Sequence, residues 1–133
     1  MEGDWTKHIV KVPELFDSEP NSYEQCVTVG PFIFVAGQAG WDKDENAVPL
    51  EFEPQVRLTF ENIRYALRTA GADLKDLVSM TVFVTDARYM GEFLELRKEI
   101  LAGTYATSAL IAVDKLIAPT MLVEIQAIAV RPS

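Results

Sequence analysis

The residue in this chain most suggestive of chemistry is Glu124, a carboxylate inside the apolar stretch at residues 121–130. An unpartnered charge is costly to bury, so Glu124 must be paired, hydrogen-bonded, neutralised or placed at a wet cleft. Gln126 has the same parity, so one face of the predicted strand carries two polar groups. Two interpretations stay open: a solvent-facing edge, or a carboxylate that serves a cleft.

The other residue types that could do chemistry are scarce, with Cys26 as the single cysteine and His8 as the single histidine. The apolar surroundings of Cys26 favour a buried, inert thiol, and the position of His8 near the amino terminus favours a solvated side chain. One cysteine and one histidine make neither a disulfide framework nor a zinc site of several such ligands within one chain. Nucleotide, phosphate-loop and His-Glu-x-x-His motifs are absent from the sequence, so we expect no metal and no cofactor.

Size and charge limit what the chain can bind. Its 133 residues, 49% of them hydrophobic, predict one folded domain over residues 1–133, with residues 1–21 as an extension that includes an edge strand. Twenty acidic against twelve basic residues leave a net charge of −8, which repels phosphate backbones and anionic lipid. We therefore expect neither nucleic acid nor membrane as a partner. The acidic amino terminus has no basic segment followed by an apolar one, which favours a cytoplasmic location.

The spacing of apolar residues predicts the elements that must position these groups. In chain order we expect strands at residues 25–29 and 32–36, a loop at 41–53, a helix at 54–70, a strand at 77–85, a helix at 87–102, and strands at 108–113 and 121–130. Gly37 and Gly40 are interpreted as the end of the second strand. Pro54 and Gly71 suit the start and end of the first helix, and Asp86 suits the cap of the second.

These elements predict an α+β fold with both helices on one face of a sheet. The first helix places Val56, Phe60, Ile63, Leu67 and Ala70 on one stripe, and the second places Phe93, Leu96 and Ile100. In the strand at 77–85, Val78, Met80, Val82 and Val84 form one apolar face. The strand at 108–113 is apolar at both parities, so we expect its uncovered face to pack on another subunit.

Five segments together carry a resemblance to a known family: Tyr-Glu-Gln at 23–25, Phe-Val-Ala-Gly-Gln at 34–38, Ala-Gly-Ala-Asp-Leu-Lys-Asp-Leu at 70–77, Thr-Val-Phe-Val-Thr-Asp at 81–86, and the stretch at 122–130. With them the chain resembles the Rid (YjgF/YER057c/UK114) superfamily of small trimeric proteins, named for reactive intermediate deaminase activity. The resemblance implies a chorismate-mutase-like subunit with a mixed sheet. It also implies a homotrimer in which the sheets form an inner barrel, with small-molecule clefts between subunits.

The resemblance further implies roles for individual residues. In family members that hydrolyse imines, the glutamate at the position of Glu124 helps to position the attacking water. The residue at Tyr23 and the backbone at Gly37 line the same cleft.

The other half of the family's site is altered in this sequence. The arginine that grips a substrate carboxylate falls on Ser108, so it is missing, and a frequent cysteine falls on Leu110. The usual asparagine of the second helix falls on Leu94. Loss of an arginine–carboxylate fork removes about 1.5–3 kcal/mol, which makes imines derived from amino acids poorer substrates.

Two cations could replace the missing arginine. Arg97 falls within the apolar stripe of the second helix, where the favoured interpretation is a stem that packs on the sheet while its head reaches water. Lys115 follows the strand that bears Ser108, and its position is typical of a solvated loop charge.

Three functions are consistent with these observations to different degrees. The favoured one is a hydrolase that deaminates an imine, enamine or related C–N substrate. The alternative is a non-catalytic ligand-binding or regulatory trimer of the same fold. An endoribonuclease, a label often attached to this family, is disfavoured by the net charge of −8 and by the lack of an acid–base pair.

Overall fold

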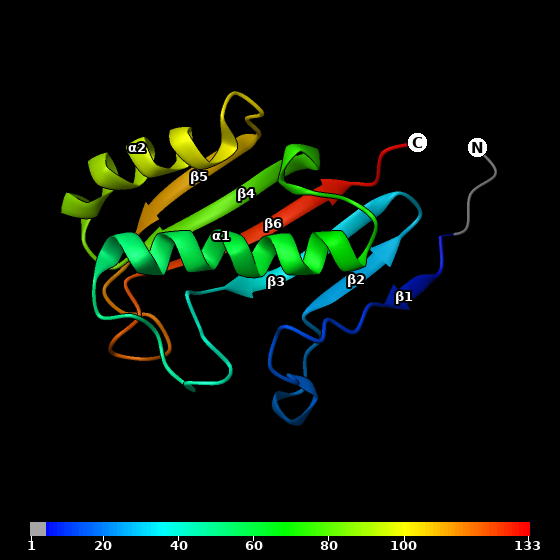
Figure 1. Cartoon of the computed structure of the whole chain (residues 1–133), viewed down its shortest axis with the longest axis horizontal. Helices are drawn as coiled ribbons and strands as arrows, with labels where there is room; N and C mark the ends of the chain where they lie inside the picture. Colours follow the sequence, from blue (N-terminus) through cyan, green and yellow to red (C-terminus); the bar gives the residue numbers. More distant parts are fainter. Residues whose placement is uncertain (1–4) are drawn as a thin grey trace.

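The computed structural model describes residues 5–133 and has two helices packed on one face of a six-stranded sheet (Figure 1). The strands are β1 (Lys7–Ile9), β2 (Cys26–Val29), β3 (Phe32–Gln38), β4 (Leu77–Val84), β5 (Thr107–Ala112) and β6 (Val123–Val130). The helices are α1 (Phe52–Thr69) and α2 (Met90–Leu101), and short 3-10 turns lie at Glu19–Asn21, Leu74–Asp76 and Ala87–Tyr89. The predicted α+β class is confirmed. The acidic start of the chain, on which the cytoplasmic expectation depends, includes residues 1–4, which lie outside the described part.

The sheet is mixed, with the strand order β1-β2-β3-β6-β4-β5. Strands β4 and β5 pair in parallel, whereas the other neighbouring strands pair antiparallel. The last strand therefore inserts between β3 and β4, and the segment that carries Glu124 lies in the interior of the sheet. The interpretation of Glu124 as a residue of a solvent-facing edge strand is wrong for this reason.

Helix α1 buries the predicted stripe, with Val56, Phe60, Ile63 and Leu67 each 1% exposed or less. It begins at Phe52, two residues before the predicted start, and the Phe52 ring stacks on Tyr89 at 4.2 Å between centroids. Pro54 is tolerated there because N–H groups of the first turn have no intrahelical acceptor. Gly71 follows the helix with a φ of +93°, as predicted.

The hairpin of β2 and β3 is confirmed, but β3 continues two residues beyond its predicted end, to Gln38. Val35 pairs with Ala127, and Gln38 pairs with Ile125, so β3 holds one extra residue opposite β6. This irregularity is a β-bulge, and Gly37 lies within it. Gly37 is thus part of the strand rather than its terminator.

The buried faces of β4 and α2 differ from prediction at one position each. Val78 is 41% exposed because the β4–β6 register shifts between Leu77 and Ser79, and Leu77 is buried instead. In α2, Leu101 completes the buried stripe, whereas Ile100 is only partly buried. The Asp86 side chain accepts a hydrogen bond from the Arg88 N–H and so caps the 3-10 turn that leads into α2.

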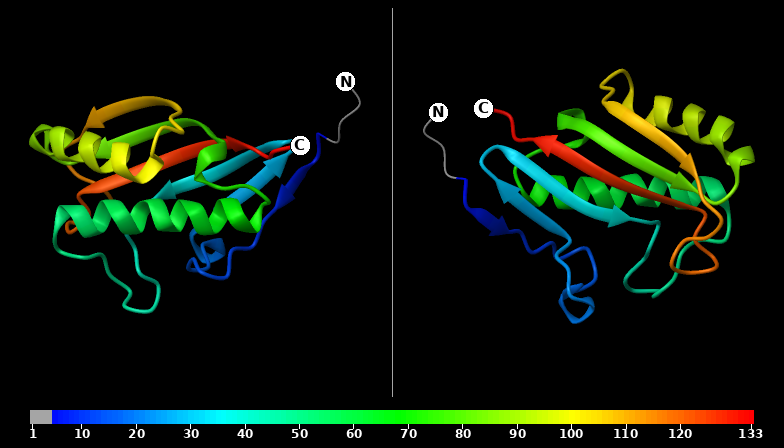
Figure 2. Two further views of the ribbon diagram at one scale, coloured as in Figure 1. Left: turned by 45° about the horizontal axis from the view of Figure 1, so that its top comes forward. Right: turned by 180° about the vertical axis from the view of Figure 1, so that it is seen from behind.

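The sheet has two unlike faces. The helix face lies under α1 and α2, and the open face is seen uncovered from behind (Figure 2). Strand alternation and cross-strand pairing place on the open face Phe32 and Phe34 of β3, Ser79, Thr81 and Phe83 of β4, and Glu124, Gln126, Ile128 and Val130 of β6. Phe34 is 39% exposed there.

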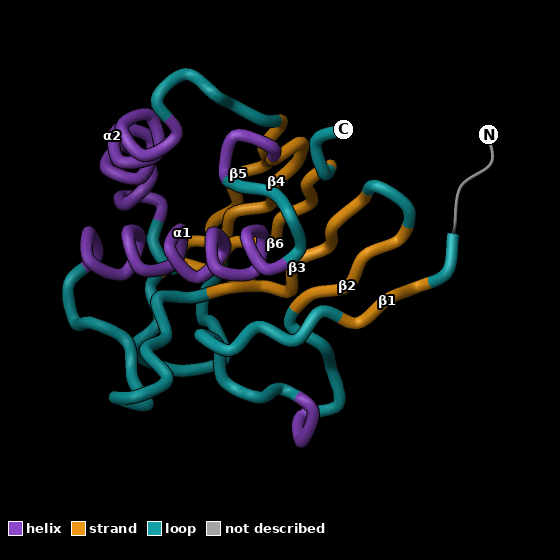
Figure 3. The backbone as a smooth tube through the Cα atoms, turned by 45° about the vertical axis from the view of Figure 1, so that its right-hand side comes forward, coloured by secondary structure: helices purple, strands orange, loops and turns teal. Residues whose placement is uncertain are grey.

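A fully buried glutamine, Gln55, joins α1 to the two long loops at one end of the sheet, drawn in teal in Figure 3. Its amide donates to the carbonyl oxygens of Pro49 at 2.6 Å and Thr120 at 2.8 Å. Its side-chain oxygen accepts from the Leu122 N–H at 2.9 Å. These bonds hold the chain where it enters β6, two residues before Glu124.

Candidate functional site

Glu124 lies on the open face, where it pairs across the sheet with Phe83 of β4. The side chain is half-buried, and its carboxylate has no hydrogen bond or ion pair with any of residues 5–133. Burial therefore raises the pKa of Glu124 above its ordinary value, since nothing within the described chain compensates the charge. A carboxylate in this environment is suited to accept and return a proton.

The bulge in β3 brings the backbone of Gly37 against this carboxylate. A Cβ atom at Gly37 would lie only 2.6 Å from Glu124 Oε2. Any side chain at this position would therefore displace the carboxylate. Tyr23 lies near enough for the negative charge of Glu124 to raise its pKa, although burial of Tyr23 is the larger cause. The structure thus brings together Tyr23, Gly37 and Glu124, which we call the open-face group.

Ser108 and Leu110 lie on the other side of the sheet. They pair in parallel with Met80 and Val82, both of which are buried beneath the helices, so their side chains point to the helix face. Arg97 of α2 reaches across to this strand, and its Nη1 donates to Ser108 Oγ at 2.6 Å.

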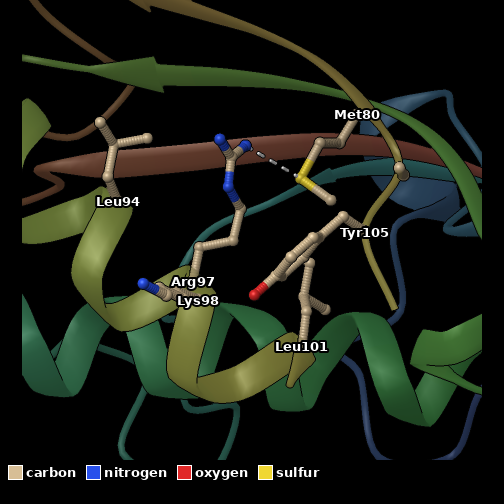
Figure 4. Close-up of a pocket in the computed structure, with 7 residues that line it drawn as sticks. Met80, Leu94, Arg97, Lys98, Leu101 and Tyr105 are labelled. Atoms are coloured by element: carbon tan, nitrogen blue, oxygen red, sulfur yellow. Dashed lines mark hydrogen bonds between the residues drawn. The ribbon is translucent and has the colours of Figure 1, made fainter. Parts of the chain in front are cut away.

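Arg97 is one of the residues that line a cavity of about 260 Å³ (Figure 4). The cavity is lined by Met80, Leu94, Arg97, Lys98, Leu101, Tyr105 and Ala106, and we call it the α2 pocket. Arg97 Cζ lies 5.1 Å from the centroid of the Phe93 ring, and Nη1 contacts Met80 Sδ at 3.6 Å. Burial lowers the pKa of Arg97, which nevertheless stays charged because an arginine titrates far above neutral pH.

The residues singled out in the sequence therefore separate into two groups. Tyr23, Gly37 and Glu124 meet on the open face, whereas Leu94, Arg97, Ser108 and Leu110 lie on the helix face. Within one chain the six-stranded sheet stands between them. One chain therefore does not bring both groups around one ligand.

The remaining candidates lie outside both groups. Lys115 is exposed in the loop between β5 and β6, as expected of a solvated charge. Cys26 is 1% exposed, which confirms a buried thiol, and burial raises its pKa to about 11, which disfavours the reactive thiolate. His8 is exposed on the edge strand β1. Over residues 5–133, three or more metal-binding side chains nowhere gather in a group that could hold an ion.

Sequence reasoning did not assign five residues of the α2 pocket to a site: Met80, Lys98, Leu101, Tyr105 and Ala106. Lys98 and Leu101 follow Leu94 at helical spacings of four and seven, so a helical projection could have placed them beside Arg97. Tyr105 lies beyond the end of α2, in the connection to β5, and no periodicity points to it.

Helices of the described chain also lack the length and apolar character needed to cross a membrane.

Comparison with known proteins decides the family. Residues 16–131 match the model of the family described as endoribonuclease L-PSP. The chain belongs to this family. Two relatives illustrate the likeness. The mitochondrial protein mmf2 of Schizosaccharomyces pombe is 38% identical to this chain over 94 residues, which cover 71% of this chain and 74% of mmf2. Escherichia coli TdcF, named as a candidate reactive intermediate deaminase, is 33% identical over 112 residues, covering 82% and 86%.

Solved structures agree with this assignment. A Thermotoga maritima protein described as a candidate endoribonuclease has a TM-score of 0.88 at 28% identity, with 96% of this chain and all of that one covered. Escherichia coli TdcF with bound serine has a TM-score of 0.83 at 28% identity, with 94% and 99% covered. A Mycobacterium tuberculosis member of the YjgF/YER057c/UK114 family has a TM-score of 0.80 at 29% identity, with 94% and 99% covered. The resemblance to the Rid superfamily is therefore confirmed.

Proposed function

We propose that this endoribonuclease L-PSP family member hydrolyses a small imine, enamine or related C–N substrate in a cleft formed between copies of the chain, with Glu124 as the proton-transfer residue. The observation that carries the proposal is the half-buried Glu124 carboxylate, which lies against the Gly37 backbone without a hydrogen-bonding partner in the described chain. Its relative TdcF of Escherichia coli is named as a candidate reactive intermediate deaminase, and this name supports the proposed chemistry.

The proposed reaction needs only water and one carboxylate. The water oxygen adds to the carbon of the C=N bond, and Glu124 accepts a water proton and passes it to the nitrogen. Glu124 then takes the hydroxyl proton of this carbinolamine and passes it to the amine nitrogen, the C–N bond breaks with its electron pair going to nitrogen, and a carbonyl compound and ammonia leave. The raised pKa of Glu124 brings this carboxylate closer to neutral pH, where it can both accept and return a proton.

The cleft between copies follows from the separation of the two groups by the sheet. The open face carries partly exposed Phe32 and Phe34, and Ile111 on β5 is 40% exposed. Covering such apolar surface is the usual function of a subunit interface, and we propose a homotrimer in which the open-face group of one copy faces the α2 pocket of another. The serine bound to the relative TdcF supports a small molecule as the ligand.

Two features argue against RNA as the substrate despite the family's description. The chain has a net charge of −8, which opposes binding of a phosphate backbone. Its single histidine lies on the edge strand β1 rather than in either group.

A location in the cytoplasm is proposed on the sequence alone.

The test is hydrolysis of an imine that carries no carboxylate, produced in situ by an amine oxidase, with semicarbazide as the competing trap. We expect the purified protein to hydrolyse imine before the trap captures it. Glu124→Gln should lower the rate of this hydrolysis by tenfold or more, because the amide accepts no proton. Glu45→Gln, a change at an exposed loop carboxylate, is the control and should have full activity. A wild-type protein that binds small ligands but never alters the trapping rate would support the non-catalytic alternative.

A further inference from the structure

The α2 pocket holds a positive charge without a counter-charge. The guanidinium of Arg97 contacts a hydroxyl, a thioether and an aromatic ring, and none of the carboxylates of residues 5–133 lies within ion-pairing distance of it. By contrast, the exposed Arg57 and Arg88 each lie 2.6 Å from a carboxylate oxygen, of Glu99 and Asp86 respectively. Arg57, Arg64, Arg68 and Arg88 each lie within 4.0 Å of a carboxylate of the described chain, whereas exposed Arg131 donates to the Ala70 carbonyl. Arg97 is thus the partly buried arginine that has no acidic partner among residues 5–133.

The guanidinium is also held in place with donors to spare. Its stem lies along the pocket wall in Figure 4, and the Phe93 ring and Ser108 Oγ constrain its plane. A guanidinium has five N–H donors, and the two described contacts both use Nη1. The remaining donors face a cavity whose other walls are largely apolar, where an anionic group would find little competition from water.

We propose that Arg97 binds the carboxylate of a small organic anion in the α2 pocket, with Ser108 orienting the guanidinium. The planar fork of an arginine matches a carboxylate in two parallel hydrogen bonds, and the apolar walls formed by Leu94 and Leu101 suit a short carbon chain. A volume of about 260 Å³ restricts the ligand to a small molecule. Lys98, on the same helix face, adds a second positive charge at the rim.

This inference deepens the proposed function and rests on it in one respect: the carboxylate belongs to the imine that Glu124 of another copy hydrolyses. The carboxylate-binding group of the cleft would then come from helix α2 rather than from strand β5. Arg97 would select among substrates by binding a remote group, without taking part in proton transfer.

The binding test uses the full-length, ¹⁵N-labelled protein and a matched pair of probes, butanoate and its neutral amide, butanamide. We expect butanoate to shift the Nε–Hε signal of Arg97 to saturation and butanamide to leave it unchanged. Arg97→Gln should weaken butanoate binding tenfold or more, and Arg97→Lys, which keeps the charge but loses the fork, should weaken it less. Arg88→Gln, a change at an arginine that faces solvent, should bind butanoate as the wild type does.

Three results would overturn the inference. Equal affinity of butanamide and butanoate would show that the charge is not recognised. Unchanged butanoate binding by Arg97→Gln would place the anion elsewhere. Inorganic phosphate that binds the pocket more tightly than butanoate would assign the site to a different anion.

Kinetics separate this inference from the proposed function. An imine with a free carboxylate and its methyl ester are compared in the trapping assay, and Arg97→Gln should raise KM for the acid tenfold or more while leaving the ester unaffected. If Arg97→Gln turned over the acid with an unchanged KM, the role of Arg97 would be overturned and the proposed function would not. Absence of turnover in the wild type would overturn the proposed function, and the butanoate titration would still decide the role of Arg97.

Discussion

The open-face group and the α2 pocket are alike in one respect and opposite in another. Each contains a half-buried charge that no described residue neutralises, Glu124 in the first and Arg97 in the second. The charges have opposite sign and lie on opposite faces of the sheet, so they do not neutralise each other within one chain. Several exposed arginines do pair, as Arg57 does with Glu53 and Glu99. Because an unpaired and partly desolvated charge is costly, we expect each to find its counterpart outside the chain, in a ligand or a second copy.

The largest expected effect comes from separating the two groups physically. Phe34→Glu places a charge on the open face, where a monomer would tolerate it at a cost of about 0.5 kcal/mol or less. In the proposed trimer the same change buries an unpaired carboxylate at the interface, so we expect loss of assembly and of activity. Light scattering of the wild type should give about three times the chain mass of 14.8 kDa.

Leu50→Glu is the control for this experiment, because Leu50 is 81% exposed in the loop before α1 and lines the same pocket as residues of α1 and α2. It should stay trimeric. A wild type that is monomeric at micromolar concentration would disprove the cleft between copies, and with it the link between the two groups.

A second pair of variants compares two glycines that lie three residues apart. Gly37→Ala forces the Glu124 carboxylate out of position and should reduce turnover by tenfold or more with little change in Tm, because the displaced atoms end a flexible side chain. Gly40→Ala meets the backbone oxygen of Gln55 at 2.7 Å. That clash should cost about 1–3 kcal/mol and lower the Tm by several degrees. Thermal melts and the trapping assay on both variants check this. A lower Tm with full turnover in Gly37→Ala would contradict the assignment of Gly37 to the site.

The third prediction concerns the pH dependence of stability at Glu124. Its pKa is raised in the folded state, so the folded protein binds the proton more tightly, and stability falls as pH rises through the window above the ordinary value of 4.5. Glu124→Gln removes this dependence. The Tm of the variant should equal or exceed that of the wild type at about pH 7, and the difference should shrink at about pH 4. A variant that melts several degrees lower at neutral pH would show that Glu124 has a structural role.

The smallest effect is expected at Cys26, which belongs to neither group. Because its pKa is raised to about 11 and its side chain is buried, iodoacetamide should leave the native protein unlabelled near neutral pH. Mass spectrometry before and after unfolding in denaturant checks this. Labelling of the native protein would reveal local opening of the β2–β3 hairpin.

Much of the fold could be predicted from the sequence because the signals are local. The stripe of Val56, Phe60, Ile63 and Leu67 follows from helical periodicity alone, and the capping role of Asp86 follows from its residue type and position. The boundaries were less accurate where tertiary contacts extend an element, as at Phe52, which stacks on Tyr89 far along the chain. The exposure of Val78 depends on the shift of register with β6, which no local pattern records.

The amino-acid sequence by itself determined that one carboxylate had to be accommodated in an apolar strand and that Arg97 had to lie near the buried stripe of a helix. Only the tertiary structure decided that β6 inserts between β3 and β4, that a bulge presses Gly37 against Glu124, and that Arg97 reaches Ser108 from another element. The reason is physical. Periodicity and residue type act over one or two turns of chain, whereas strand order and the face on which a charge lies depend on contacts between segments far apart in sequence.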